Sequence, residues 1–543
     1  MSGGGTSNVP LLGGKVERIV WITLGISIVL FATAITWANV QNVDIGLVGK
    51  RSSDEYAFTL VLCRMYEGVL TLNPRDFFNI SFFSYGFPYF FLQLILTVPA
   101  QILHSYEAIL IVGRSFSLAW AVGTLALAAW WINRRAGSWG YGLAAVWLMI
   151  AMPGLTNLSV QMHPDTMMCF FVLAGFVAAA ELNPARSRDV IIVGLLCGLG
   201  ACAKIQIVIY APFIAMLMGL RVLLEHNEGR FQTRLVPAAG VAASVGLLTP
   251  VTYLVLNPFL VKGEALQAFI RDFNENMASN ATNQFSYMLP TVTEKLDMLA
   301  QYYFPVALLV AVFAALVLAI YWFKCPLTTL VPELSILCCG AVTCIYIFIT
   351  VHKTWDSYYL ASFVLLIVSL LAIAGRVLPR RRPVRIGLGV IAATALTLIA
   401  VRTPAAISAR IVDDGPERPV SASIVSLVSS PLERVTDPQL LISPYTPFQF
   451  QKLGLSITHV HSIKGVLADK QLDDANIIII RKNDIYFTGP TVALDNQLGE
   501  EAREARKRID VMRANKDNVF FPCGENAIVF VLCRRTDTRP EGQ

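Results

Sequence analysis

The sequence contains 543 residues, of which 55% are hydrophobic and only 15% are charged. A soluble protein carries about 25% charged residues, so the composition excludes an ordinary soluble domain. The apolar residues gather in blocks of roughly 18–25 residues, the length that crosses a bilayer core of about 30 Å. The net charge of +6 does not indicate a nucleic-acid partner, because the basic residues cluster at the ends of apolar blocks and no basic patch with interleaved aromatic residues is evident.

Basic residues beside the apolar blocks predict which side of the membrane each loop faces. If these clusters are cytoplasmic, the first block is a retained helix, the N-terminus is cytoplasmic, and everything after about residue 403 lies outside. The sequence thus predicts a multi-pass α-helical protein of a bacterial inner or plasma membrane, with about 11 transmembrane helices. The expected spans are residues 18–39, 108–132, 140–157, 166–183, 190–204, 206–223, 236–256, 301–323, 328–351, 358–375 and 386–402.

One further apolar block, Phe87–Leu103, does not fit this count. If it crossed the membrane, either the basic N-terminal end or the Arg134–Arg135 pair would face outward. The block also contains Pro88 and Pro99, which are poor helix-interior residues. We therefore expect it to lie in the outer interface. The first outer loop is then predicted to hold juxtamembrane helices, beginning with an amphipathic stretch over residues 55–70.

The composition changes sharply after the last expected span, which predicts two domains: a transmembrane domain over residues 1–402 and a soluble extracytoplasmic domain over residues 403–543. Short β-like runs at 440–443, 457–461, 477–480 and 527–532, together with a helical pattern at 498–515, predict a small α/β fold for the second. Its Cys523 and Cys533 would form a disulfide if this domain faces an oxidising compartment, and are two free thiols otherwise.

Two acidic motifs stand beside membrane segments on the same expected face. Asp54 and Glu55 follow the first span by about fifteen residues, and Asp165 lies directly before the start of the fourth span. Each motif alone fits a helix N-terminus, where acidic residues serve as caps. Acidic residues at a membrane boundary are costly, however, and mark functional sites where they face a cavity. Their shared side therefore favours one outward-facing acidic site, in which His163 is a second cap or an assistant to Asp165.

Four motifs follow one another within residues 18–225: DEYAF from Asp54, GRSFSLAWAVGTLALAAWWINRR from Gly113, HPDTMMCFFVLAGF around Asp165, and GLGACAKIQIVIY with Lys204. In this order they resemble motifs of the GT-C glycosyltransferases, in particular the branch of protein O-mannosyltransferases and lipid A aminoarabinose transferases. DEYAF resembles the start of the family's first outer loop, and the second motif resembles its second spanning helix. HPDTMMCFFVLAGF, around Asp165, resembles the second acidic motif, and GLGACAKIQIVIY the helix that follows, with its Lys204. VHKTWDSYYL is a weaker likeness to a late outer turn.

The resemblance implies transfer of a single sugar, with inversion, from a polyprenyl-phosphate donor to an acceptor hydroxyl on the outer face. The acceptor is a glycan, a lipid or a protein. Such an attack needs a carboxylate to take the hydroxyl proton, a role we assign to Asp54. Glu55 and Asp165 would orient acceptor or sugar. A divalent ion held by Asp54 and Asp165 is left open as a cofactor.

The departing lipid phosphate needs a cation. Lys204 is the first candidate, because it is a lone charge near the outer end of an apolar helix, although snorkelling to the interface is its ordinary alternative. Arg114 is the second, with an ion pair to Glu107 as its alternative. His352 and Lys353 complete the set, although both also suit simple interface anchoring.

A transporter or flippase of a lipid-linked sugar is the competing function. Such proteins place polar groups near the bilayer midplane on broken helices. In this sequence the acidic residues gather at one surface instead, which favours an enzyme.

Overall fold

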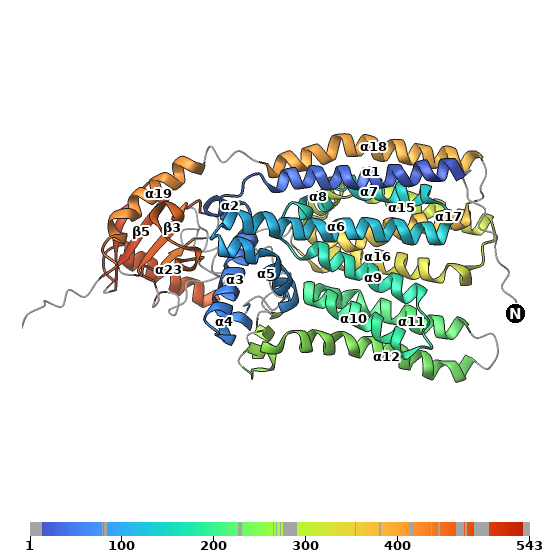
Figure 1. The fold of residues 1–543 in the computed structure, drawn as a ribbon, viewed down its shortest axis with the longest axis horizontal. Helices are drawn as coiled ribbons and strands as arrows, with labels where there is room; N and C mark the ends of the chain where they lie inside the picture. Colours follow the sequence, from blue (N-terminus) through green and yellow to red (C-terminus); the bar gives the residue numbers. More distant parts are fainter. Residues whose placement is uncertain are drawn as a thin grey trace, which may run out of the picture. The chain divides into compact units, whose positions relative to one another are not determined.

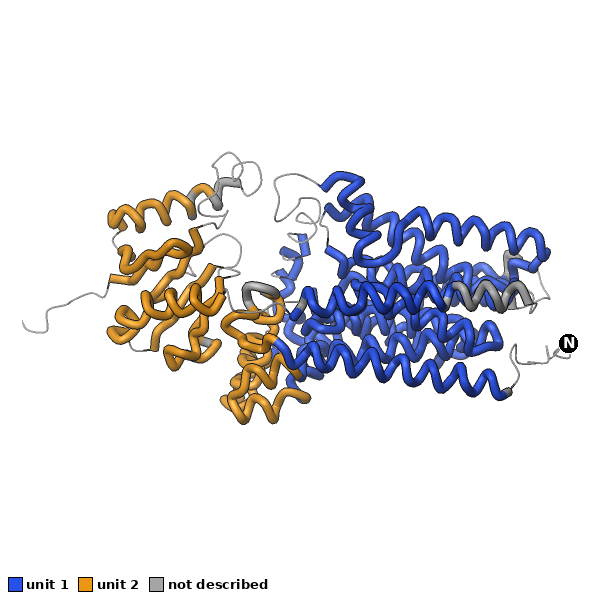
Figure 2. The backbone as a smooth tube through the Cα atoms, turned by 90° about the horizontal axis from the view of Figure 1, so that it is seen from above, with its two compact units in different colours: residues 1–41, 78–95, 112–411 blue, residues 42–77, 96–111, 412–543 orange. Residues whose placement is uncertain are grey.

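A computed structural model describes the chain from residue 14 to residue 535, apart from residues 79, 81–83, 226–230, 264, 268, 272, 275–289, 353–354, 379–381, 412–416, 436, 444–445, 463–471, 473–474, 483–498 and 518. The chain divides into two compact units (Figure 2). The first comprises residues 1–41, 78–95 and 112–411, and the second comprises residues 42–77, 96–111 and 412–543. The second unit thus combines the C-terminal part of the chain with two segments of the expected first outer loop.

The first unit is a bundle of long helices whose axes run in a common direction (Figure 1). Short 3-10 turns, η1 (Ile205–Ile209), η2 (Pro258–Val261), η3 (Leu327–Leu330) and η4 (Asp356–Tyr359), join some of them. The helices are α1 (Gly14–Asn39), α6 (Tyr106–Ala136), α7 (Trp139–Ile150), α8 (Pro153–Ser159), α9 (Asp165–Glu181), α10 (Ser187–Ala203), α11 (Ala211–Glu225), α12 (Phe231–Leu256), α14 (Val292–Tyr302), α15 (Val306–Trp322), α16 (Val331–Thr350), α17 (Leu360–Val377) and α18 (Arg382–Arg410).

The described helices confirm a multi-pass membrane protein. Six are long and apolar enough to cross a bilayer, and up to eight spans result if two bent pairs each count once. The bent pairs are α7 with α8 and α14 with α15, which turn by 71° and 73°. The other three expected spans coincide with α9, α10 and α18, of which α9 and α10 have only 17 residues each. Every expected span thus corresponds to a helix, but length and composition support six to eight crossings, fewer than the expected eleven.

The apolar block of the first outer loop forms helix α5 (Phe87–Ile102). Its 16 residues would extend only about 24 Å at 1.5 Å per residue, less than the bilayer core of about 30 Å. Helices α2 (Ile45–Arg51), α3 (Ser53–Leu70) and α4 (Pro74–Phe78) precede it. The loop is therefore helical, as the sequence indicates, and α3 covers the stretch expected to be amphipathic.

The C-terminal part of the second unit contains a five-stranded sheet with strand order β2-β1-β3-β5-β4. β1 (Leu440–Ile442) pairs in parallel with β2 (Val460–Ser462) and β3 (Ile477–Arg481), and β5 (Val529–Arg534) pairs antiparallel with β3 and β4 (Phe520–Glu525). Helices α19 (Glu417–Leu432) and α23 (Gly499–Arg513) complete this part. The expected α/β fold is confirmed, and β4 is an additional strand.

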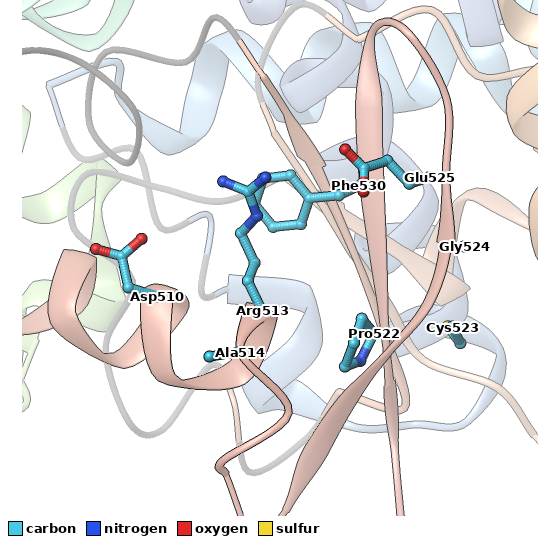
Figure 3. Close-up of a pocket in the computed structure, with 8 residues that line it drawn as sticks. All are labelled: Asp510, Arg513, Ala514, Pro522, Cys523, Gly524, Glu525 and Phe530. Atoms are coloured by element: carbon cyan, nitrogen blue, oxygen red, sulfur yellow. The ribbon is translucent and has the colours of Figure 1, made fainter.

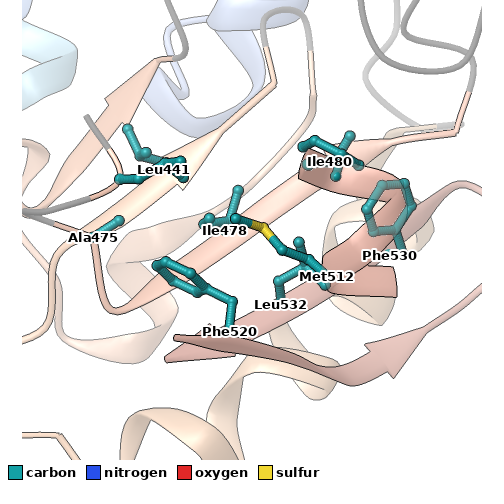
Figure 4. Packing of buried hydrophobic residues seen from close by; sticks show 10 residues of the cluster. Leu441, Ala475, Ile478, Ile480, Met512, Phe520, Phe530 and Leu532 are labelled. Carbon is teal, nitrogen blue, oxygen red and sulfur yellow. The ribbon is translucent and has the colours of Figure 1, made fainter. Parts of the chain in front are cut away.

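One face of this sheet packs against α23 through a compact apolar core (Figure 4). Ile478 and Ile480 of β3 and Leu532 of β5 meet Ile509 and Met512 of the helix, all almost completely buried. β3 is apolar and buried over four consecutive residues, as is typical of a central strand covered on both faces. This core holds the sheet and α23 together despite the polar composition of the tail.

The structure joins Cys523 and Cys533 in a disulfide between the neighbouring strands β4 and β5, with Cα atoms 5.7 Å apart. Such bonds persist in oxidising compartments and are rare in the cytosol. If the tail faces outward, alkylation of living cells should leave this pair unmodified until a reductant is added. Mass spectrometry of the tryptic peptides measures this, with Cys325, in an expected cytoplasmic loop, as the reduced control. Immediate alkylation of Cys523 would contradict the outward placement.

Candidate active site

The first acidic motif occupies the start of α3. Ser52 caps this helix, because its hydroxyl accepts a hydrogen bond from the backbone N–H of Glu55 at 3.2 Å. The capping function expected for the acidic residues is therefore filled by serine. Asp54 is half-buried in the first helical turn, and Glu55 is 3% exposed. A buried carboxylate is costly without compensating contacts, which sets this pair apart from ordinary surface caps.

The second acidic motif forms a buried ion-pair cluster in the first unit. Asp165 begins α9, is completely buried, and makes no side-chain cap there. One carboxylate oxygen accepts a hydrogen bond from Lys204 Nζ at 2.9 Å, and the other lies against Nδ1 of His163. The carboxylate is thus directed toward two basic side chains. Both alternatives for His163 and Lys204 thus meet the same observation, which is that each side chain contacts the carboxylate of Asp165.

A break in the helix positions Lys204. Helix α10 ends at Ala203, and the backbone of Lys204 is extended, with φ −154° and ψ 128°, before η1 begins. The ammonium group also lies 5.0 Å from the centroid of the Tyr358 ring, a cation–π distance. Gln206 donates a hydrogen bond to the Tyr358 carbonyl at 3.0 Å and so ties η1 to η4. The lysine is thereby held between a carboxylate and an aromatic face.

Residues 84–86 of the expected first outer loop form a short strap that packs against this cluster. Ile205 N–H donates to the carbonyl of Ser84 at 3.0 Å, and Gly86 N–H donates to the carbonyl of Cys202 at 2.9 Å. A Cβ at Gly86 would lie 2.7 Å from Cys202 Cα, so a larger residue would push the strap away. Between these anchors, Tyr85 meets the ring of His163 edge-on, with centroids 5.9 Å apart. Tyr85, between Ser84 and Gly86, thus lies beside the cluster.

Ser117 of α6 fixes the turn that carries His163. Its hydroxyl donates to the His163 carbonyl, and the His163 N–H donates to the same hydroxyl oxygen, both at 3.1 Å. Ser117 is 1% exposed. A serine inside an apolar span gave no signal that sets it apart in the sequence, so reasoning from residue types alone missed it.

The remaining predicted cations are placed differently. Arg114 is buried, and its Nη1 donates to the carbonyls of Asn39 at 3.2 Å and Gln41 at 3.0 Å, at the end of α1. Its expected alternative partner, Glu107, accepts a hydrogen bond from Ser105. His352 is half-buried after α16, and Lys353 lies outside the described residues.

Lys295 is a buried cation that the sequence did not single out. Its Nζ donates to the carbonyls of Phe348 and Val351, each at 2.7 Å, and so satisfies the last turn of α16. A cation is favourable at a helix C-terminus. Lys295 therefore has a structural role beside the turn that carries His352.

The described residues show no arrangement suited to a metal ion. They contain no group of three or more His, Cys, Asp or Glu side chains placed to hold one. The two oxygens of Asp165 already face Lys204 and His163, whereas a divalent ion is bound through carboxylate oxygens that are free to coordinate it. The donor set around Asp165 does not fit the suggested ion.

A depression in the C-terminal domain contains none of the predicted acids or cations (Figure 3). The guanidinium of Arg513 lies over the ring of Phe530, 4.5 Å from its centroid, at this place. The lining residues are Asp510, Arg513, Ala514, Pro522, Cys523, Gly524, Glu525 and Phe530. The depression is thus a feature of the sheet and of α23, separate from the acidic motifs.

The chain has the fold of the GT-C glycosyltransferases. It is similar to ArnT from Cupriavidus metallidurans bound to undecaprenyl phosphate, with a TM-score of 0.55, 11% identity, and coverage of 95% of this chain and 98% of that one. The apo state of the same ArnT gives a TM-score of 0.54, 12% identity, and coverage of 94% and 97%. The chain is also similar to the apo form of the oligosaccharyltransferase from Archaeoglobus fulgidus, with a TM-score of 0.52 and 12% identity. This match covers 91% of this chain and 73% of the oligosaccharyltransferase. No family model and no curated protein matches the sequence. The resemblance seen in the motifs is confirmed for the fold.

Proposed function

We propose that this protein is a polyprenyl-phosphate-dependent glycosyltransferase that moves a single sugar to an acceptor hydroxyl on the outer face of the membrane. The observation that carries the proposal is the buried Lys204–Asp165–His163 cluster within a GT-C fold. Ionisable residues inside a membrane protein are costly and rare, and those that occur mark ligand sites or transport pathways. The similarity to a protein bound to undecaprenyl phosphate supports a lipid phosphate as that ligand.

In the proposed reaction, the acceptor oxygen attacks the anomeric carbon from the face opposite the lipid phosphate. Asp54 takes the hydroxyl proton, which makes the oxygen a stronger nucleophile. The bond between the anomeric carbon and the phosphate oxygen breaks, its electron pair stays on the phosphate, and the sugar configuration inverts. Lys204 stabilises the released charge. Glu55 orients the acceptor, and Asp165 with His163 holds Lys204 in place.

The proposed topology completes this function. The N-terminus is cytoplasmic, the catalytic transmembrane domain spans residues 1–402, and residues 403–543 form an extracytoplasmic domain in a bacterial inner or plasma membrane. Arg114 is the second proposed contact of the donor phosphate, after Lys204. It ranks lower because its Nη1 already donates hydrogen bonds to two carbonyls at the end of α1. His352 and Lys353 remain proposed contacts of the donor phosphate.

A transfer assay tests the proposal directly. Purified protein in lipid nanodiscs receives a panel of radiolabelled undecaprenyl-phosphate hexoses and pentoses, together with glycan, lipid and peptide acceptors. We expect one equivalent of free undecaprenyl phosphate for each sugar transferred, and a product of inverted anomeric configuration. Movement of intact donor across proteoliposomes without cleavage would instead establish the transporter. Donor cleavage with retained configuration would contradict the proposed single displacement.

A further inference from the structure

The C-terminal domain makes a continuous set of contacts with the helix that carries Asp54 and Glu55. Both belong to the second compact unit. The domain contributes one segment, residues 448–461, which runs through η5 (Phe450–Leu453) and η6 (Ile457–His459) to the edge strand β2. We call this segment the brace. It contacts the chain both before and after the acidic motif.

Before the motif, the brace joins α2 by close backbone packing. Phe448 N–H donates to the Gly46 carbonyl at 2.8 Å, and Gln449 Nε2 donates to Asp44 Oδ2 at 2.6 Å. Asp44 is also the N-cap of α2, through its bond from Gly46 N–H. A Cβ at Gly46 would lie 2.6 Å from the Phe448 oxygen. The helix leading to Asp54 is therefore fixed against the brace with no room for a side chain.

Immediately after the motif, the brace holds α3 through Tyr56. The Tyr56 hydroxyl donates to the Val460 carbonyl on the sheet edge at 2.9 Å. Burial raises the pKa of Tyr56, so this hydroxyl stays protonated and able to donate. The ring meets Phe450 edge-on at 6.5 Å, and Phe450 meets Tyr106 in the same way at 6.2 Å. Tyr106 in turn accepts a hydrogen bond from Ile457 N–H at 3.1 Å.

Two turns further along α3, Arg64 extends the contact. Its Nη2 lies 3.4 Å from Nδ1 of His461, and Nε2 of His461 lies 2.9 Å from Gln439 Oε1. Because arginine only donates, His461 accepts at Nδ1 and donates from Nε2 to the glutamine oxygen. Val460 and His461 of the edge strand β2 thus both contact side chains of α3.

We propose that the C-terminal domain is a positioning element of the active site, whose brace sets the place of the Asp54–Glu55 pair. Phe450 and Tyr56 are its positioning residues. The inference rests on the proposed function, because it gives α3 the catalytic base. A general base must lie within about 3 Å of the proton it takes, and misplacement by about 1 Å is able to lower a rate about 100-fold. The brace fixes α3 within two residues of both carboxylates.

Two paired substitutions test the brace. Phe450→Ala removes the ring between Tyr56 and Tyr106, and its control is Phe521→Ala, on β4. Tyr56→Phe removes only the hydroxyl, and its control is Tyr66→Phe, a partly exposed tyrosine of the same helix. We expect kcat to fall at least tenfold in Phe450→Ala and about threefold to tenfold in Tyr56→Phe. Neither should change the KM for the donor, and both controls should stay within twofold of wild type.

Hydrogen exchange gives a readout that does not need catalysis. Peptides covering residues 53–62 should exchange faster in Phe450→Ala and Tyr56→Phe than in their controls, whereas peptides of α9 and α10 should not change. If α3 exchanged faster in the variants but the wild-type protein transferred no sugar, the contact between the brace and α3 would be supported and the proposed function would be rejected. If exchange rates and kcat in each variant matched those of its control, the proposed positioning role of the brace would be wrong. A raised KM for the donor with an unchanged kcat would contradict it as well.

Discussion

Asp165→Asn is expected to lower the rate of sugar transfer at least 100-fold. The substitution leaves the buried ammonium of Lys204 without its carboxylate, which costs about 3–5 kcal/mol of stability when a buried ion pair loses one partner. Lys204 would then lack the carboxylate that holds its ammonium group in place, so it would no longer be positioned to stabilise the leaving phosphate. Initial transfer rates per folded molecule, together with the thermal unfolding midpoint, measure both effects.

A second substitution separates catalysis from stability. Replacing both partners of a buried ion pair by neutral side chains is often neutral or stabilising, so Asp165→Asn with Lys204→Met should unfold at a temperature near that of the wild type. Its transfer rate should nevertheless remain as low as in the single variants, because the phosphate has lost its cation. If transfer returned together with stability, Lys204 and Asp165 would have only a structural role.

A buried ion-pair cluster elsewhere in the helical bundle supplies a matched control. Glu333 is completely buried, and its Oε1 lies 2.6 Å from Nε of Arg135 and 3.0 Å from Nη1 of Arg376. These residues stand at the ends of α6, α16 and α17 that are expected to face the cytoplasm. Glu333→Gln should therefore destabilise the protein to a similar degree, yet leave kcat per folded molecule unchanged. A comparable loss of kcat would show that any buried charge defect disables the protein.

The membrane architecture could be predicted from the sequence because it depends on local composition. Lengths of apolar blocks and positions of basic residues gave a helix for every expected span. Among the described residues, a test of length and composition alone selects only six to eight of these helices, because α9 and α10 have 17 residues each and the α7–α8 and α14–α15 pairs bend sharply. Both breaks fall at a proline, Pro153 at the start of α8 and Pro305 at the N-cap of α15, which the length of an apolar block does not record.

The site could be predicted only in part. Asp165 and Lys204 were identified singly, because a lone charge in an apolar context is visible in the sequence, and the structure pairs them. Ser117, Tyr85 and Tyr358 were not identified, because serine and aromatic residues are common in membrane helices and their importance comes from contacts with the cluster. The brace could not be predicted from the sequence either, because its contacting residues, such as Tyr56 and Val460, are separated by 404 positions.

Asp54→Asn is expected to lower kcat by about 10²–10⁴, the usual contribution of general-base catalysis. The donor KM should stay within about threefold of the wild-type value, since the proposed phosphate contact belongs to Lys204. Asp76→Asn makes the same chemical change on exposed α4, where Asp76 accepts a hydrogen bond from Asn73 at 2.6 Å, and should leave kcat unaltered. A raised donor KM with normal kcat in Asp54→Asn would move this residue from catalysis to donor binding.

Chemical rescue distinguishes a base from a residue that only orients the acceptor. Asp54→Gly leaves space beside the acceptor hydroxyl, and added formate should restore part of the rate in proportion to its concentration, because a small carboxylate is able to take the proton. Glu55→Gly should respond differently: the loss of this carboxylate should appear in the KM for the acceptor, and formate should not restore activity. If formate rescued Glu55→Gly and not Asp54→Gly, the two neighbouring carboxylates would exchange roles, while the proposed reaction and the phosphate contact of Lys204 would stand.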